Sequence, residues 1–240
     1  MSVAQQTTIA QRIAALREEI DSYAGGRQVD LMLAAKHQSV DNLIAAIDAG
    51  GTLMGHNVVQ QLVAASEGLA ERGYSGRATN MMIGNVQSNK LSQAMAWAAR
   101  IDTVDKLRTA TRINRRQQTR VEAGEASGPY PILLQVNSSG ATTQFGCAPD
   151  QLLELARQIS ELEFVRIDGL MTIGAQGEEA EIRASFARVR ELSEQMRALD
   201  GLAHADVLSM GMSGDLRIAI EEGSTVVRVG TAIFGPREQK

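Results

Sequence analysis

Residues 30–39, DLMLAAKHQS, decide between two folds that are both built from alternating strands and helices. Residues 31–35 form a short apolar run of the kind that builds a buried strand. In an open doubly wound sheet, the first strand normally leads into a glycine-rich loop that binds phosphate. Here the strand leads into Lys36 and then into HQS, without a glycine, so the stretch favours a closed (β/α)8 barrel.

The same alternation continues on both sides of this strand. Seven further apolar runs with strand character are separated by helical patterns, and they lie at residues 52–55, 78–84, 100–104, 131–137, 165–174, 205–211 and 224–230. Upstream, residues 9–20 carry isoleucine and leucine at helical spacing, and Gly25 and Gly26 end that helix. We therefore predict an α/β fold, a (β/α)8 TIM barrel with an additional N-terminal helix, as one domain over residues 1–240. The stretch 121–130 is the one segment with the composition of a linker.

The composition excludes several classes of function. The chain has 240 residues, 44% of them hydrophobic, and its net charge of −4 argues against nucleic-acid or membrane binding. The one cysteine, Cys147, permits no internal disulfide, and the three histidines do not have the spacing of metal ligands. The N-terminal segment lacks the basic and apolar regions of a signal peptide, so we expect a cytoplasmic protein that binds no metal.

Lys36 is the first candidate for chemistry, because it ends an apolar strand. Lysine is rarely fully buried, and it often closes a strand with its aliphatic stem while its amine stays in water. The functional alternative is that the fold needs an amine there, since active groups of such barrels gather at the carboxyl ends of the strands. Alternation puts Met32, Ala34 and Lys36 on one face, so Ala34 would leave room beneath a partly desolvated amine that can attack a carbonyl carbon.

Two loops near the end of the sequence have the composition of a phosphate site. Residues 209–215, SMGMSGD, and residues 230–235, GTAIFG, follow the seventh and eighth predicted strands, where this fold often holds phosphate. Glycines in both loops let backbone amides approach an anion, and Ser213 and Thr231 add hydroxyl donors. Such loops are often plain turns. Their joint position, together with the lysine at the end of the first strand, favours a phosphate site.

Arg228 lies inside the eighth predicted strand, on the same face as Gly230. One reading is an ion pair in the barrel interior, and the other is a cation that faces a ligand. An amine for a Schiff base, two phosphate loops and a buried cation together fit pyridoxal 5'-phosphate, with Arg228 facing the nitrogen of the pyridine ring.

Several motifs along the chain resemble one known family. LAAKHQ, GHNVVQQ, IGNVQSNK, TVDKL, PILLQVNSSG and GLMTIG, and above all LSMGMSGDLRIAIEEGSTVVRVGTAIFGPRE, resemble the pyridoxal-phosphate homeostasis proteins. These are single-domain barrels similar to the N-terminal barrel of alanine racemase. The resemblance runs from about residue 10 to residue 238, and its last motif is long, unbroken and specific.

The resemblance implies a cofactor site but no catalytic residue and no metal ligand. The positions that it carries over as cofactor-binding are Lys36, Asn57, Ser209, Met210, Ser213, Arg228, Gly230 and Thr231. It implies that Lys36 forms an aldimine with pyridoxal 5'-phosphate and that Arg228 faces the pyridine nitrogen. Ser213, Gly230 and Thr231 correspond to the phosphate-binding positions, with Ser209 and Met210 close by.

The chain departs from the family pattern at several positions near these motifs. The departures are His56 in place of glutamate, Val58 in place of an aromatic residue, Asn85 and Asp102 in place of histidine, and Ala35 in place of serine. We hypothesise that His56 and Asp102 face one another across the barrel mouth, so that the carboxylate raises the pKa of the histidine. The alternative is unrelated drift at two solvated positions.

Three functions are compatible with these features. The first is a carrier or regulator that is not an enzyme: it holds the cofactor, limits free pyridoxal phosphate in vitamin B6 homeostasis and supplies apo-enzymes that depend on the cofactor. The second is an amino-acid racemase or related lyase, and the third is a sugar-phosphate aldolase. Racemases on this barrel have a second, mostly β domain that supplies a tyrosine base, which we do not expect here. We therefore predict the carrier, as a monomer or weak homodimer.

Overall fold

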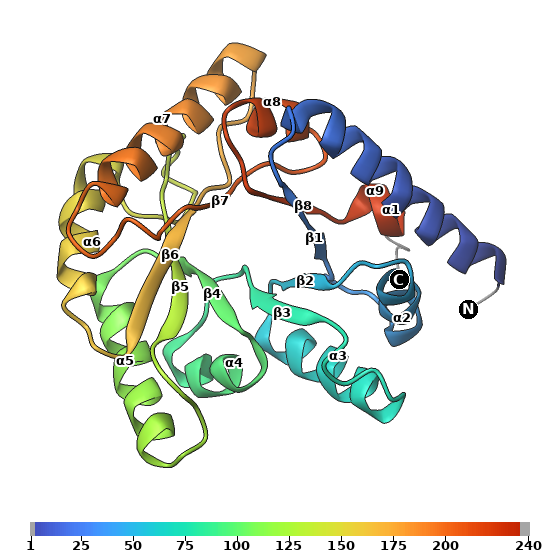
Figure 1. Ribbon diagram of the computed structural model, residues 1–240, viewed down its shortest axis with the longest axis horizontal. Helices are drawn as coiled ribbons and strands as arrows, with labels where there is room; N and C mark the ends of the chain where they lie inside the picture. The colour runs from blue at the N-terminus through green and yellow to red at the C-terminus, as the bar shows by residue number, and fades with distance from the viewer. Residues whose placement is uncertain (1–2, 236–240) are drawn as a thin grey trace.

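Eight parallel strands close into a barrel in sequence order, and the last strand pairs with the first (Figure 1). The computed structural model describes residues 3–235. The strands are β1 (Asp30–Ala34), β2 (Leu53–His56), β3 (Thr79–Met82), β4 (Arg100–Val104), β5 (Tyr130–Gln135), β6 (Val165–Met171), β7 (Val207–Ser209) and β8 (Val226–Val229). The predicted closed parallel barrel is confirmed.

Helices alternate with the strands and form the outer ring of the barrel (Figure 1). They are α1 (Val3–Ala24), α2 (Val40–Asp48), α3 (Val59–Glu71), α4 (Leu91–Trp97), α5 (Leu107–Glu122), α6 (Leu152–Ser160), α7 (Glu179–Arg197), α8 (Leu216–Glu221) and α9 (Thr231–Phe234), with short 3-10 turns η1 (Ser88–Lys90) and η2 (Pro149–Gln151). None of the helices within residues 3–235 is long and apolar enough to cross a membrane.

The predicted additional helix, α1, covers the seam between β1 and β8. It packs against α2, α8 and α9, and Figure 1 shows it beside the last two of these helices. Its buried isoleucine and leucine side chains share one hydrophobic cluster with Leu33 of β1 and with Val227 and Val229 of β8. Because α9 has only four residues, α1 takes the place that a full helix after β8 would occupy.

Alternation along β1 fixes which side chains face the barrel interior. Leu33 and Ala35 belong to the outer cluster beneath the helices, so Met32 and Ala34 face inward. A Cβ atom on Gly55 of β2 would lie 2.8 Å from the sulfur of Met32, which places these two residues side by side inside the barrel. The amide of Ala35 still bonds to the carbonyl of Gly55, at 2.9 Å. The strand pattern therefore continues to the residue before Lys36.

Part of the barrel interior is charged. Ile101 of β4 packs in the outer core, so its neighbours Arg100 and Asp102 face inward, where their side chains form a two-point ion pair with N–O distances of 2.6 and 3.1 Å. Arg166 and Asp168 of β6 form a pair of the same geometry, at 2.6 and 3.2 Å. Both pairs arise from the same tripeptide, Arg-Ile-Asp.

The linker-like stretch 121–130 separates no domains. It contains the end of α5, a turn and the first residue of β5. Strand β5 pairs directly with β4, which precedes this stretch in the sequence. The prediction of a linker is wrong because a short exposed turn between a helix and a strand has the same composition of glycine, serine and charged residues as a linker.

Candidate functional site

Lys36 lies at the carboxyl end of β1, directly beside the end of β8. Leu33 pairs with Val229, so the next position on β8, Gly230, meets Ala34. A Cβ atom on Gly230 would lie 3.2 Å from the Cβ of Ala34 and 3.3 Å from its carbonyl oxygen. The Lys36 side chain is half-buried, and its amine makes no hydrogen bond or ion pair within residues 3–235. An amine without a partner thus sits next to one of the two predicted phosphate loops.

Arg228 is a buried cation held by neutral groups. It is 6% exposed, and its guanidinium donates to the carbonyl and hydroxyl oxygens of Ser209, at 2.6 and 2.9 Å, and to the carbonyl of Thr172, at 2.8 Å. Burial lowers the pKa of Arg228, although the carboxylates of Asp102 and Asp215 act in the opposite direction. Arg228 has no ion pair within the described part of the chain. The ion-pair reading is therefore wrong, and the three hydrogen bonds leave guanidinium N–H groups that can donate to a ligand.

The loops after β7 and β8 present hydrogen-bond donors at the same mouth. Residues 211–215 are joined to β8 by a bond from the amide of Arg228 to the carbonyl of Gly211, at 3.0 Å. The carboxylate of Asp215 accepts from the amide of Met212, at 2.6 Å, which closes the loop into a turn. Ser213 and Thr231 are exposed, and within the described residues their hydroxyl groups have no hydrogen-bond partner. Two free hydroxyls and flanking amides are donors that suit a phosphate group.

Asn57, Ser209 and Met210 are the other predicted site residues, and the side chain of Met210 points away from the mouth. Asn57 directly follows β2, is half-buried, and leads into α3. Ser209 is fully buried at the end of β7 and contributes through its contacts with Arg228. Met210 is different, because its side chain packs in the outer hydrophobic core. Only the main chain of Met210 is therefore left to face a ligand.

The hypothesis that His56 and Asp102 face one another is wrong. Asp102 faces the barrel interior and pairs with Arg100. His56 faces outward: its Nε2 lies 2.9 Å from Oδ1 of Asn80, whose amide donates to the hydroxyl of Ser66 in α3, at 3.1 Å. Burial lowers the pKa of His56, and the hydrogen bond with Asn80 offsets this only in part. Neither residue is solvated, so the alternative of drift at two solvated positions is wrong as well.

Two features of the site were not identified from the sequence. One is Thr172, which follows β6 and binds Arg228 through its carbonyl oxygen, a contact for which no side-chain type gives a signal. The other is the ion pair of Arg100 and Asp102, for which a signal exists. Two opposite charges separated by one isoleucine in a strand point to the same face.

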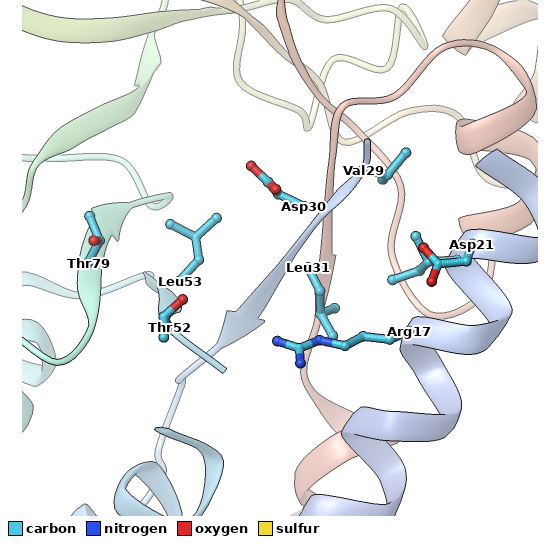
Figure 2. A pocket seen from close by; sticks show the side chains of 9 residues that line it. Arg17, Asp21, Val29, Asp30, Leu31, Thr52, Leu53 and Thr79 are labelled. Carbon is cyan, nitrogen blue, oxygen red and sulfur yellow. The ribbon is translucent and has the colours of Figure 1, made fainter. Parts of the chain in front are cut away.

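Two cavities lie away from the predicted residues. One of about 410 Å³ opens at the amino ends of β1, β2 and β3, on the opposite side of the barrel from Lys36. Figure 2 shows Arg17 and Asp21 of α1 beside this cavity, on the side of Leu31, whereas the side chain of Asp30 at the start of β1 points away from α1. The other, of about 640 Å³, lies between the loops that follow β5 and β6 and the helix α7. Neither cavity is lined by any of the eight predicted cofactor-binding residues.

Comparisons with known proteins agree with this geometry. The family described as "Alanine racemase, N-terminal domain" matches residues 12–238. The pyridoxal phosphate homeostasis protein of Vibrio alginolyticus is 34% identical over 97% of this chain and 99% of its own length. The structure of PipY from Synechococcus elongatus with pyridoxal phosphate bound is 32% identical, with a TM-score of 0.81 over 95% of this chain and all of that chain.

A more distant comparison concerns the fold alone. Alanine racemase of Clostridium difficile is 12% identical, with a TM-score of 0.76 over 97% of this chain and 58% of that one. The expected similarity to the barrel of alanine racemase is therefore confirmed for the fold. Together, the nearly complete coverage and the identity above 30% show that the chain belongs to the pyridoxal phosphate homeostasis protein family.

Proposed function

We propose that this protein binds pyridoxal 5'-phosphate through an aldimine to Lys36 and acts in vitamin B6 homeostasis as a carrier or regulator, without strong catalytic activity. The observation that carries the proposal is the buried Arg228, whose charge has no carboxylate partner within hydrogen-bond distance among residues 3–235. It lies at the same barrel mouth as the unpartnered amine of Lys36. A ligand that combines a hydrogen-bond acceptor for the guanidinium with a reactive carbonyl group for the amine suits both residues.

The residues at the mouth fit the parts of this cofactor. Ser213, Gly230 and Thr231 would bind the phosphate, and Asn57 would contact the ring. Arg228 would face the pyridine nitrogen and leave it unprotonated, because a guanidinium does not give up its proton near neutral pH. When bound, the cofactor supplies an electrophilic carbon for amines and an electron sink for carbanions. An unprotonated ring nitrogen makes that sink weaker.

The positions of the tyrosines favour a carrier over the alternative, an amino-acid racemase or related lyase. The chain has three tyrosines. Tyr130 is buried and donates to the carbonyl of Ala98, at 2.7 Å, and Tyr74 donates to Asp48 at the edge of α2. Tyr23 lies in α1, outside the barrel. None of them lies at the mouth to act as the second base of a racemase.

Transfer to cofactor-dependent apo-enzymes would take place at the rim of the mouth. Val58, Phe145 and Met212 are large hydrophobic side chains that remain 40, 58 and 36% exposed. They lie in the segments that follow β2, β5 and β7, which are at the carboxyl end of the barrel. Only a contiguous apolar patch is typical of a surface that contacts another protein, whereas single exposed apolar residues are common.

Reduction with borohydride tests the covalent attachment. The purified protein with pyridoxal phosphate should show the visible absorbance band of an aldimine, and reduction should fix a pyridoxyl group on the peptide that contains Lys36. Lys36→Ala should abolish the label and leave the fold intact. Lys90→Ala is the matched control, because Lys90 is also half-buried and follows β3, which lies two strands away from β1 in the barrel. A label on Lys90 in the native protein would refute the assignment.

Substitution of the phosphate-binding hydroxyls tests the rest of the site. Ser213→Ala and Thr231→Val should each weaken binding of pyridoxal phosphate roughly ten- to a hundredfold, because a hydrogen bond to a charged group contributes about 1.5–3 kcal/mol. Binding of pyridoxal, which lacks the phosphate, should be weak in the native protein and unchanged in both variants. Equal affinity of the native protein for the two compounds would rule out this phosphate site.

A further inference from the structure

The residue after Lys36 has an unusual backbone conformation. His37 has a φ angle of +59°, and among the described residues it is the one non-glycine residue with a positive φ. A side chain in this left-handed region crowds the following carbonyl group, so the conformation is strained for histidine. Strained residues persist only where surrounding contacts hold them, and they are frequent at functional sites.

The imidazole ring of His37 supplies such a contact. Its Nδ1 lies 2.9 Å from Nε2 of Gln61, in the first turn of α3, so the amide donates to the ring. The other amide atom of Gln61, Oε1, is buried and has no hydrogen-bond partner within residues 3–235. The Oε1 atom of Gln61 is therefore desolvated without a hydrogen bond in return, and within the same residues the side chain of Gln61 makes one hydrogen bond, to His37. This bond connects the turn after β1 to the helix that begins two residues after Asn57.

The backbone on the other side of His37 is held as well. Gln38 donates from its side chain to the carbonyl of Lys36, at 3.3 Å, and accepts from the side chain of Asn42, at 3.0 Å. The backbone N–H of Asn42 donates to the hydroxyl of Ser39, which caps α2. The turn that carries Lys36 is thus fixed to α2 by Gln38 and to α3 by His37, and the amine itself is left without a partner.

We propose that His37 is a positioning residue for Lys36: its bond to Gln61 holds the left-handed turn that directs the amine into the barrel mouth, toward a carbonyl group of the ligand. This inference rests on the function proposed above. The strained turn is retained because it sets the direction of the amine, and the ring of His37 does not contact the ligand.

Two ligands separate the position of the amine from the binding site around it. Pyridoxal phosphate can attach to Lys36, whereas pyridoxine phosphate has an alcohol in place of the aldehyde and cannot attach. In ligand-free protein, His37→Ala should slow the attachment of pyridoxal phosphate about 3- to 10-fold, the factor expected for one hydrogen bond of ordinary strength. Its dissociation constant for pyridoxine phosphate should stay within twofold of the native value.

Matched variants distinguish positioning from a general structural role. His37→Asn should attach at the native rate, because its Oδ1 takes the place of Nδ1 as acceptor and asparagine tolerates a positive φ. His37→Gly relieves the strain and removes the ring, so it should unfold at a temperature no lower than the native protein and still attach slowly. Gln61→Leu should be as slow as His37→Ala, and the double variant should be no slower than either.

The outcomes separate this inference from the proposed function. If the native protein attaches pyridoxal phosphate to Lys36 but His37→Ala does so at the native rate, the inference fails and the proposed function stands. A His37→Asn variant as slow as His37→Ala, or equal losses for the two ligands, would also overturn the inference. If the native protein does not attach the cofactor to Lys36, the proposed function fails and the inference fails with it.

Discussion

Replacing Asp102 by asparagine should cost far more stability than the same change at Asp168. The two carboxylates make ion pairs of matching geometry, with closest N–O distances of 2.6 Å in both. They differ in burial: the side chains of Arg100 and Asp102 are 10 and 0% exposed, and those of Arg166 and Asp168 are 49 and 18% exposed. The chain thus contains an internal comparison of one ion pair in two environments.

Burial sets the expected magnitudes. Removing one partner of a buried pair leaves an uncompensated charge and costs about 3–5 kcal/mol. An exposed pair contributes about 0–1 kcal/mol, because water and salt screen it. For a chain of this length, each kcal/mol lowers the midpoint of thermal unfolding by about 2–4 °C. Asp102→Asn should therefore lower the midpoint by about 6–20 °C, and Asp168→Asn by no more than about 4 °C.

Denaturant unfolding and scanning calorimetry measure both losses. A double variant, Arg100→Met with Asp102→Leu, provides the control, because it removes both charges and should recover most of the stability lost in Asp102→Asn. Equal losses in Asp102→Asn and Asp168→Asn would refute the argument that burial controls the energy of these pairs. A double variant as unstable as the single one would show that the loss comes from packing and not from the unpaired arginine.

Two further predictions concern pH and close packing. Burial lowers the pKa of His56 in the folded protein. The contribution of His56 to the free energy of unfolding should therefore be complete above the pKa of an unfolded histidine, about 6.5, and should be lost as the pH falls through the folded pKa, by at most about 1.4 kcal/mol per pH unit. The prediction is wrong if the free energies of unfolding of native protein and His56→Gln fall in parallel with pH. Gly230→Ala should cost about 1–3 kcal/mol, because the new Cβ lies 3.2 Å from Ala34. Gly214→Ala should cost less than about 0.5 kcal/mol, since no atom of the described residues lies within 4 Å of the position of the new Cβ; denaturant unfolding of both variants tests the contrast.

The barrel could be predicted from the sequence because the decisive signals are local. The absence of glycine after residues 31–35 argues against an open sheet, and the apolar stripe over residues 9–20 shows the additional helix. The ends of the strands could not be predicted. The third run was expected to extend to residue 84, but β3 ends at Met82, because the end of a strand depends on the neighbouring strand that bonds to it as well as on its own apolar run.

The sequence indicates candidate site residues where a charged residue interrupts an apolar run, as Lys36 and Arg228 do. It does not do so where the direction of a side chain depends on the phase of a strand. In β2 the sequence does not show which residues face inward, because Gly55, which does, has no side chain. The prediction that His56 lies at the mouth is therefore wrong, and His56 faces α3. His37 could not be identified, since most histidines have a negative φ and the positive φ here depends on the contacts that hold the turn.

The pairing of β1 with β8 also has a consequence for the order in which the chain is made. Ala34 and Gly230 meet at this seam, although roughly 190 residues separate them, and a ribosome needs about 10 to 40 s to add that many residues at 5–20 residues per second. During that interval the nascent chain carries Lys36 but not the loop that completes its surroundings. The cofactor would therefore bind only after synthesis has passed the last strand, and by joining the first strand to the last it would oppose reopening of the ring.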